Sequence, residues 1–165
     1  MDLNTSIIGL IILTIISVPL VYIQMSQNIQ KKKAKHKFIA DAKTNQVHIS
    51  EMDFWGTYYA IAMDSSENKL VYSKKTDDET VWITADLNKV TDCYIHKTER
   101  TFKNKTTNKI ETDRIDLVLR TKDQKDYVFE FFNVDINVEM TKEKVLLEKW
   151  QAQIKKQLVA FKAAA

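Results

Sequence analysis

The chain has 165 residues, of which 44% are hydrophobic and 28% are charged, and its formal net charge is +3. Two glycines and one cysteine exclude glycine-rich phosphate loops, nucleophile elbows, an internal disulfide framework and multi-cysteine zinc sites. We therefore expect one packed domain with a short appended segment, no enzymatic activity and no cofactor.

The N-terminal segment, residues 1–30, contains an uncharged apolar run from Ile7 to Ile23. Its length is near the lower limit for crossing a bilayer, so the run predicts a transmembrane helix over about residues 6–25. A cleaved signal peptide is disfavoured, because no basic residue precedes the run and no small-residue cleavage site follows it. A buried core helix fits poorly with the basic residues that come next.

Residues 31–44 form a basic linker with five clustered lysines: Lys31, Lys32, Lys33, Lys35 and Lys37. Basic residues follow the apolar run and none precedes it. The positive-inside rule then predicts a single-pass protein of the cell membrane, with its N-terminus outside and the remainder in the cytoplasm. These lysines are candidates for binding anionic lipid head groups, or they act only as a topological signal. The helix can continue toward Ala42 and is expected to break near Thr44.

Short runs rich in β-branched and aromatic residues, separated by turn residues, predict six or seven strands in the following part of the chain. In the last two of these runs, Ile115, Leu117 and Leu119 alternate with polar residues, and Tyr127, Phe129 and Phe131 share one face. The expected strands lie at 46–50, 57–63, 69–74, 80–84, 89–97, 115–121 and 127–132.

From Thr141 to about Phe161 the sequence has strong helix propensity and contains neither glycine nor proline. Apolar residues recur there at helical spacing and form one stripe, which predicts an amphipathic helix packed on the strands. The stripe consists of Met140, Leu147, Trp150, Ile154, Leu158 and Phe161.

These elements predict an α+β fold for residues 45–165: a small antiparallel β-barrel or sandwich capped by the C-terminal amphipathic helix. The segments GTYYAIAMDSSENKLVYSKK, VTDCYI and IDLVLRTKDQKDYVFEFF, with the final helix carrying Trp150, resemble bacterial membrane-anchored pleckstrin-homology-like (PH-like) domains. The resemblance covers roughly residues 55–161 and implies this fold. It does not imply inositol-phosphate binding, because the loop at 64–68 lacks basic residues.

The segment 97–109 carries five basic side chains against one acidic side chain, Glu99. It is a candidate site for an anion or an acidic partner, and the alternative is a solvated hairpin loop. The basic residues are Lys97, Arg100, Lys103, Lys105 and Lys109. Trp55 is either a core residue or, if exposed beside Gly56, part of a docking patch.

Metal and nucleic-acid binding are not expected. Cys93 and His96 would point to opposite faces of one strand, and the basic segment has only Phe102 for base stacking. The preferred hypothesis is a membrane-anchored binding or scaffold module that contacts a protein partner or assembles with itself. The alternatives are a sensor of anionic lipids that uses the linker and the 97–109 segment, and a non-catalytic subunit of a membrane enzyme.

Overall fold

The computed structural model describes residues 3–56, 59–76, 79–103, 108–137, 140 and 142–164. The side chains of 3–12, 102–103, 108–109 and 162–164 are not described. The chain divides into two compact units, residues 1–41 and residues 42–165. Each unit is described by itself.

Helix α1 (Leu3–Thr44) contains Pro19 and ends at the break that the sequence predicts. Beyond its last turn, Gln46 adopts a left-handed backbone with φ of 57°. The Gln46 amide donates to the Lys43 carbonyl at 3.0 Å, and the Val47 amide donates to the Ala42 carbonyl at 2.9 Å. This is the Schellman ending of a helix, and the two residues at the positions that usually make its apolar contact, Val47 and Ala42, are both buried.

The expectation of a transmembrane helix is contradicted. Among the helical residues with described side chains, no stretch is long and apolar enough to cross a membrane. The single-pass topology and the cell-membrane localisation depended on this helix, so both are corrected with it.

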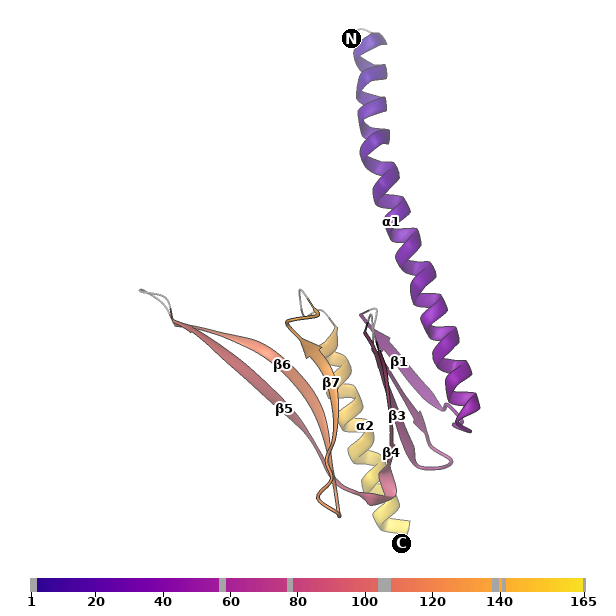
Figure 1. Cartoon of the computed structure of the whole chain (residues 1–165), viewed down its shortest axis with the longest axis vertical. Coiled ribbons are helices and arrows are strands. Elements are labelled where there is room, and N and C mark those ends of the chain that lie inside the picture. Colours follow the sequence, from indigo (N-terminus) through magenta and orange to yellow (C-terminus); the bar gives the residue numbers. More distant parts are fainter. Residues whose placement is uncertain are drawn as a thin grey trace. The chain divides into compact units, whose positions relative to one another are not determined.

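Among its described residues, the second unit contains seven strands in two antiparallel sheets (Figure 1). Sheet A has the order β1 (Glu51–Trp55), β2 (Tyr59–Asp64), β3 (Lys69–Lys75) and β4 (Thr80–Asp86). A short 3-10 turn, η1 (Leu87–Lys89), leads to sheet B. Sheet B has the order β5 (Val90–Lys103), β6 (Asn108–Thr121) and β7 (Tyr127–Asn133). Residues 46–50, expected as a strand, precede β1 instead.

The expected barrel does not form, since none of the described strands pairs across the two sheets. Strand β7 is an edge of sheet B, and side chains of sheet A occupy two of its carbonyls. The Trp55 indole donates to the Phe131 carbonyl at 2.9 Å, and the Tyr72 hydroxyl donates to the Glu130 carbonyl at 2.7 Å. These acceptors would be needed by the amides of a neighbouring strand, so side-chain hydrogen bonds join the sheets where a ladder would close a barrel.

Helix α2 (Glu143–Ala164) covers the core between the sheets, and most of the predicted stripe is buried. Leu147, Trp150, Ile154 and Leu158 pack with the inner residues of both sheets, whereas Phe161 is exposed. Polar contacts fix the same helix at both sides of the core. Trp150 Nε1 donates to Asp53 of β1 at 2.9 Å, and Gln151 Nε2 donates to the Cys93 carbonyl of β5 at 3.4 Å.

Candidate interaction surface

Strands β5 and β6 continue well beyond the rest of sheet B. Each has 14 residues, but β7 pairs only with the part of β6 from Arg114 to Leu119. Past that point the two strands pair only with each other. We call this two-stranded extension, together with the Thr98–Arg114 pair at its base, the ribbon (Thr98–Lys103 with Asn108–Arg114). It projects from sheet B in Figure 1.

A β-bulge marks the base of the ribbon. Thr98 pairs with Arg114 and Glu99 pairs with Thr112, so Asp113 is an extra residue on β6. Its carbonyl accepts a hydrogen bond from the Val134 amide at 3.0 Å, just after β7 ends. Bulges bend a strand and end regular pairing, which accounts for the ribbon's departure from the sheet at this residue.

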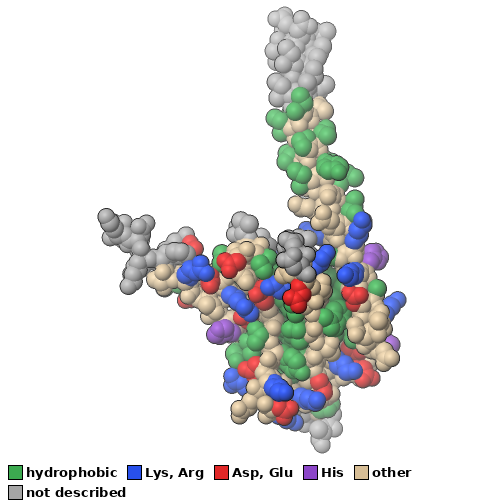
Figure 2. Space-filling view, in the orientation of Figure 1, with side chains coloured by type: hydrophobic (Ala, Val, Ile, Leu, Met, Phe, Trp, Pro, Cys, Tyr) green, Lys and Arg blue, Asp and Glu red, His purple; other side chains and the backbone are tan. Residues whose placement is uncertain are grey.

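The ribbon is exposed along β5 and partly exposed along β6. All β5 residues from His96 to Thr101 are exposed, and on β6 the apolar side chain of Ile110 is 63% exposed. Figure 2 shows basic and acidic side chains next to each other on this part of the surface. A two-stranded ribbon cannot bury a core of its own, so its side chains on both faces are available to a partner.

Two of the predicted anion-binding residues lie on β5 and form ion pairs. Lys97 Nζ lies 2.8 Å from Glu99 Oε1, and Arg100 Nη2 lies 2.8 Å from Asp113 Oδ1. Both basic groups are therefore locally neutralised, which weakens the case for a simple anion site. Lys105 lies outside the described residues, as do the side chains of Lys103 and Lys109.

The remaining predicted residues lie elsewhere. Trp55 is 4% exposed, and its ring stacks on Phe131 with a centroid distance of 4.4 Å. It belongs to the core and presents no docking patch. The linker lysines, Lys31, Lys32, Lys33, Lys35 and Lys37, are all exposed on α1. They belong to the unit of residues 1–41, whereas the 97–109 segment belongs to the unit of residues 42–165.

Strand β5 is an edge of sheet B, and its backbone groups are capped near α2. The Cys93 amide donates to Asp92 Oδ1 at 2.8 Å, and the Cys93 carbonyl accepts from Gln151. Both groups therefore point away from β6. Backbone direction alternates along a strand, so Ile95, Lys97, Glu99 and Thr101 also direct their amides and carbonyls outward. That part of the edge is exposed from His96 onward.

A buried charged group, Glu130 of β7, lies where the sheets meet. Its carboxylate accepts hydrogen bonds from Tyr59 at 2.8 Å, from Lys74 at 2.6 Å and from Asn133 at 3.2 Å. Burial acts to raise the pKa of Glu130, but these hydrogen bonds together lower that pKa below its ordinary value. Burial and the hydrogen bond to Glu130 both raise the pKa of Tyr59.

A second buried carboxylate, Asp116, lies directly opposite Glu130 in the regular register of β6 and β7. Arg114 Nε donates to both oxygens of Asp116 at 2.8 Å. Burial raises the pKa of Asp116, and the contact with Arg114 only partly offsets this. The charged side chains of β3, β6 and β7 are thus paired with one another, and the cluster links the two sheets.

Sequence reasoning did not find this cluster. Glu130 alternates with the core residues Phe129 and Phe131, and such a position normally faces solvent. The available signal was the run of apolar residues on both faces of β7, which indicates a strand buried on both sides. Lys74 gave no signal, because a lysine at the end of an expected strand is ordinarily exposed.

No protein-family model matches this chain, and comparisons with curated proteins and with solved structures likewise find no match. The resemblance to PH-like domains therefore stays a prediction.

Proposed function

We propose that this chain is a non-enzymatic binding module that acts through protein–protein contacts or self-assembly, with the ribbon as its contact surface. The observation that carries the proposal is the exposed two-stranded extension of β5 and β6. It adds little to the core, and it presents both side chains and an open strand edge. Extended peptides and strands commonly bind to such edges through backbone hydrogen bonds.

The chemistry of the ribbon favours a protein over an anionic ligand. Lys97 and Arg100 are already paired with acidic side chains, so their charge is mixed with that of Glu99 and Asp113. Interfaces between proteins tolerate such a polar mixture around a few apolar contacts, and Ile110 is one available contact.

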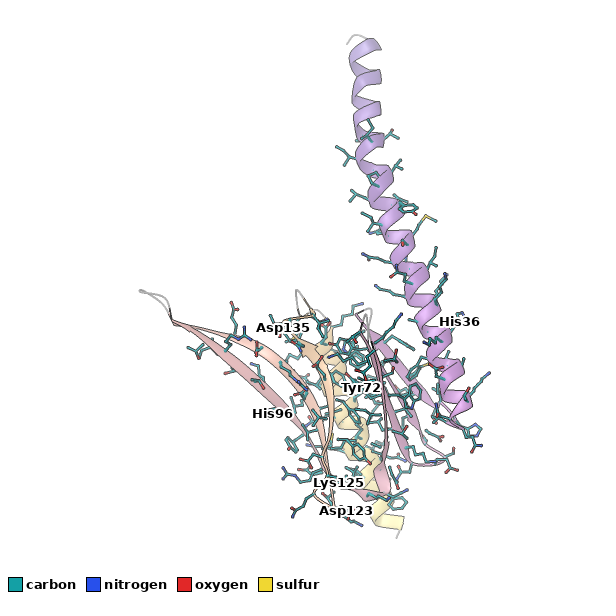
Figure 3. All side chains as sticks on the ribbon, in the orientation of Figure 1. His36, Tyr72, His96, Asp123, Lys125 and Asp135 are labelled. Atoms are coloured by element: carbon teal, nitrogen blue, oxygen red, sulfur yellow. The ribbon has the colours of Figure 1, made fainter. Side chains whose placement is uncertain are left out.

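Site-specific photocrosslinking in cells that express the full chain tests the proposal. A benzophenone amino acid replaces Thr98 on the ribbon or, as the control, Lys125 in the loop between β6 and β7 (Figure 3). Both positions are exposed. We expect a discrete crosslinked product from position 98, with one partner peptide identified by mass spectrometry, and little from position 125. Equal or absent crosslinking at the two positions would contradict the proposal.

A further inference from the structure

We propose that the open edge of β5 pairs with β5 of a second copy of this chain, antiparallel, with a two-fold axis at Thr98. The inference rests on the proposed function and names the occupant of the ribbon edge. Pairing extends from Ile95 to Thr101, a typical strand length, and joins the two copies of sheet B into one continuous sheet.

The direction of the backbone groups restricts the possible registers. The extra residue of the bulge, Asp113, lies on β6, so β5 keeps its alternation past Thr98. Ile95, Lys97, Glu99 and Thr101 face outward, and an antiparallel ladder must pair outward-facing residues with one another. The two-fold axis must therefore pass through a residue and not between two residues.

Charge complementarity selects one of these registers. With the axis at Thr98, Lys97 lies opposite Glu99 of the second copy, and symmetry makes this contact twice. An axis at Lys97 or at Glu99 would place that residue opposite its own counterpart, with like charges in contact. Opposite charges facing each other across strands are favourable, and like charges are unfavourable.

The other neighbouring registers fail for separate reasons. An axis at Arg100 places two guanidinium groups together. An axis at His96 would pair Cys93 with Glu99 of the second copy. The amide and carbonyl of Cys93 are already hydrogen-bonded to Asp92 and Gln151. In the selected register the outermost backbone pair is Ile95 with Thr101, and the capped residue Cys93 is not needed.

The selected register also leaves room for the helices. Gln151 ties α2 to Cys93, five residues from the axis. The two copies of Cys93 then lie about 33 Å apart along the strands, at about 3.3 Å per residue. A helix with its side chains is about 10 Å across, so the segments of α2 at Cys93 do not collide.

Charged residues on an edge strand usually prevent pairing between chains. Here the order of the charges along β5 favours pairing. Lys97 and Glu99 already lie 2.8 Å apart within one strand, and each is nearly half exposed. When the strand turns by 180° about Thr98, the same two charges exchange places, so the edge is complementary to itself.

Charge reversal in the full chain tests the register. Lys97→Glu and Glu99→Lys each place like charges opposite one another twice, and we expect each variant to dimerise at least about tenfold more weakly than the unmodified chain. The double variant restores both contacts and should recover dimerisation. An equimolar mixture of the two single variants should form a heterodimer, because one ribbon is then acidic and the other basic.

Analytical ultracentrifugation up to about 1 mM measures these affinities, a range suited to small interfaces. Lys125→Glu is the matched control, because this lysine is exposed in the loop between β6 and β7, outside the paired segment. It should dimerise like the unmodified chain. Recovery in the double variant and in the mixture separates a lost contact from a misfolded ribbon. A monomer throughout the range, or single variants that dimerise normally, overturns the proposal.

A disulfide gives an independent measurement. In this register the two copies of residue 98 form a pair without hydrogen bonds, with Cα atoms about 4.5 Å apart, which suits a disulfide. Thr98→Cys should form a linked dimer on mild oxidation, whereas Thr101→Cys should not, because its two copies lie about 20 Å apart. Equal linking at both positions overturns the register. If crosslinking at position 98 captures a different protein while the chain stays monomeric, this inference fails and the proposed function stands.

Discussion

At the scale of single residues, Asp116 and Glu130 are two buried carboxylates with opposite pKa shifts. Three hydrogen-bond donors lower the pKa of Glu130, whereas burial raises the pKa of Asp116. A lowered pKa means that the ionised form stabilises the fold at neutral pH. A raised pKa means that the ionised form is a net cost at neutral pH, and that this cost is removed as the pH falls through the folded-state pKa.

Replacing Glu130 by glutamine should therefore lower the free energy of unfolding at pH 7 by about 1–3 kcal/mol, since Lys74 and Tyr59 lose their charged acceptor. The deficit should shrink as the pH falls below the ordinary pKa of glutamate and through the lowered pKa of folded Glu130, because Glu130 of the unmodified chain then becomes protonated. Urea unfolding at several pH values measures both effects. Asp116→Asn is the comparison, and a deficit as large as that of Glu130→Gln at pH 7 would contradict the assignment.

Gln46 is a non-glycine residue in the left-handed position of a helix ending. Glycine adopts this backbone without strain, so Gln46→Gly should raise the free energy of unfolding by about 0.5–1 kcal/mol. Asn45→Gly changes the neighbouring residue, which lacks a positive φ, and should be neutral or destabilising. Thermal unfolding of the two variants checks this, and a gain in both or in neither would show that the helix ending is not the cause.

Cys93 is fully buried, and burial raises the pKa of its thiol to about 12. At pH 8 only about one thiol in 10,000 is ionised, so alkylation of the folded chain should be very slow. Labelling with iodoacetamide, followed by mass spectrometry, should become rapid only at urea concentrations that unfold the core. Fast labelling in buffer would show that the core between β5 and α2 opens readily.

At the scale of elements, removal of most of the ribbon should leave the stability of the domain nearly unchanged. Replacing residues 101–110 by Asn-Gly joins Arg100 to Glu111, whose backbones face each other, through a two-residue turn of the kind that favours hairpins. The described residues removed in this way are largely exposed, so the free energy of unfolding should change by less than about 1 kcal/mol. Urea unfolding measures this, and a larger loss would indicate that the ribbon supports the core.

The sequence predicts the elements that bury a regular apolar pattern. The stripe of α2 and the alternation of Leu117 and Leu119 are confirmed, because burial follows directly from helical and strand periodicity. The same reasoning took residues 97–109 for a loop. Lys97, Glu99 and Arg100 bury nothing, so β5 and β6 extend there without the apolar alternation that marks a strand.

Irregular pairing accounts for a further difference. Asp116 meets Glu130 in the regular register of the β6–β7 hairpin, but the bulge at Phe131 then places Phe132 opposite Ile115, and Phe132 is buried as well. A single extra residue in one strand changes which side chains meet, and the sequence carries no local signal for it. The ribbon begins at such a bulge, at Asp113, so its geometry could not be predicted from residue types.

At the scale of the whole molecule, the distinction between a barrel and two sheets depends on the edge of β7. Trp55 was expected to be either a core or a surface residue. Its indole in fact donates a hydrogen bond to the Phe131 carbonyl of β7 at 2.9 Å. Trp55→Phe keeps the stacked ring and removes that hydrogen bond. It should cost about 1–2 kcal/mol, because the Phe131 carbonyl is left without this donor. Chemical unfolding measures the loss, and no loss would mean that the sheets are held by packing alone.

The sealed edge of β7 also limits how far association through sheet B can go. Continuous association of sheets, edge to edge, requires that both edges of each sheet are free to pair. In this sheet, indole and phenol groups already occupy two carbonyls of β7, and in the proposed dimer the edge of β5 is occupied by its own copy. Association through sheet B is therefore self-terminating. At high protein concentration we therefore expect dimers and no fibres formed through sheet B.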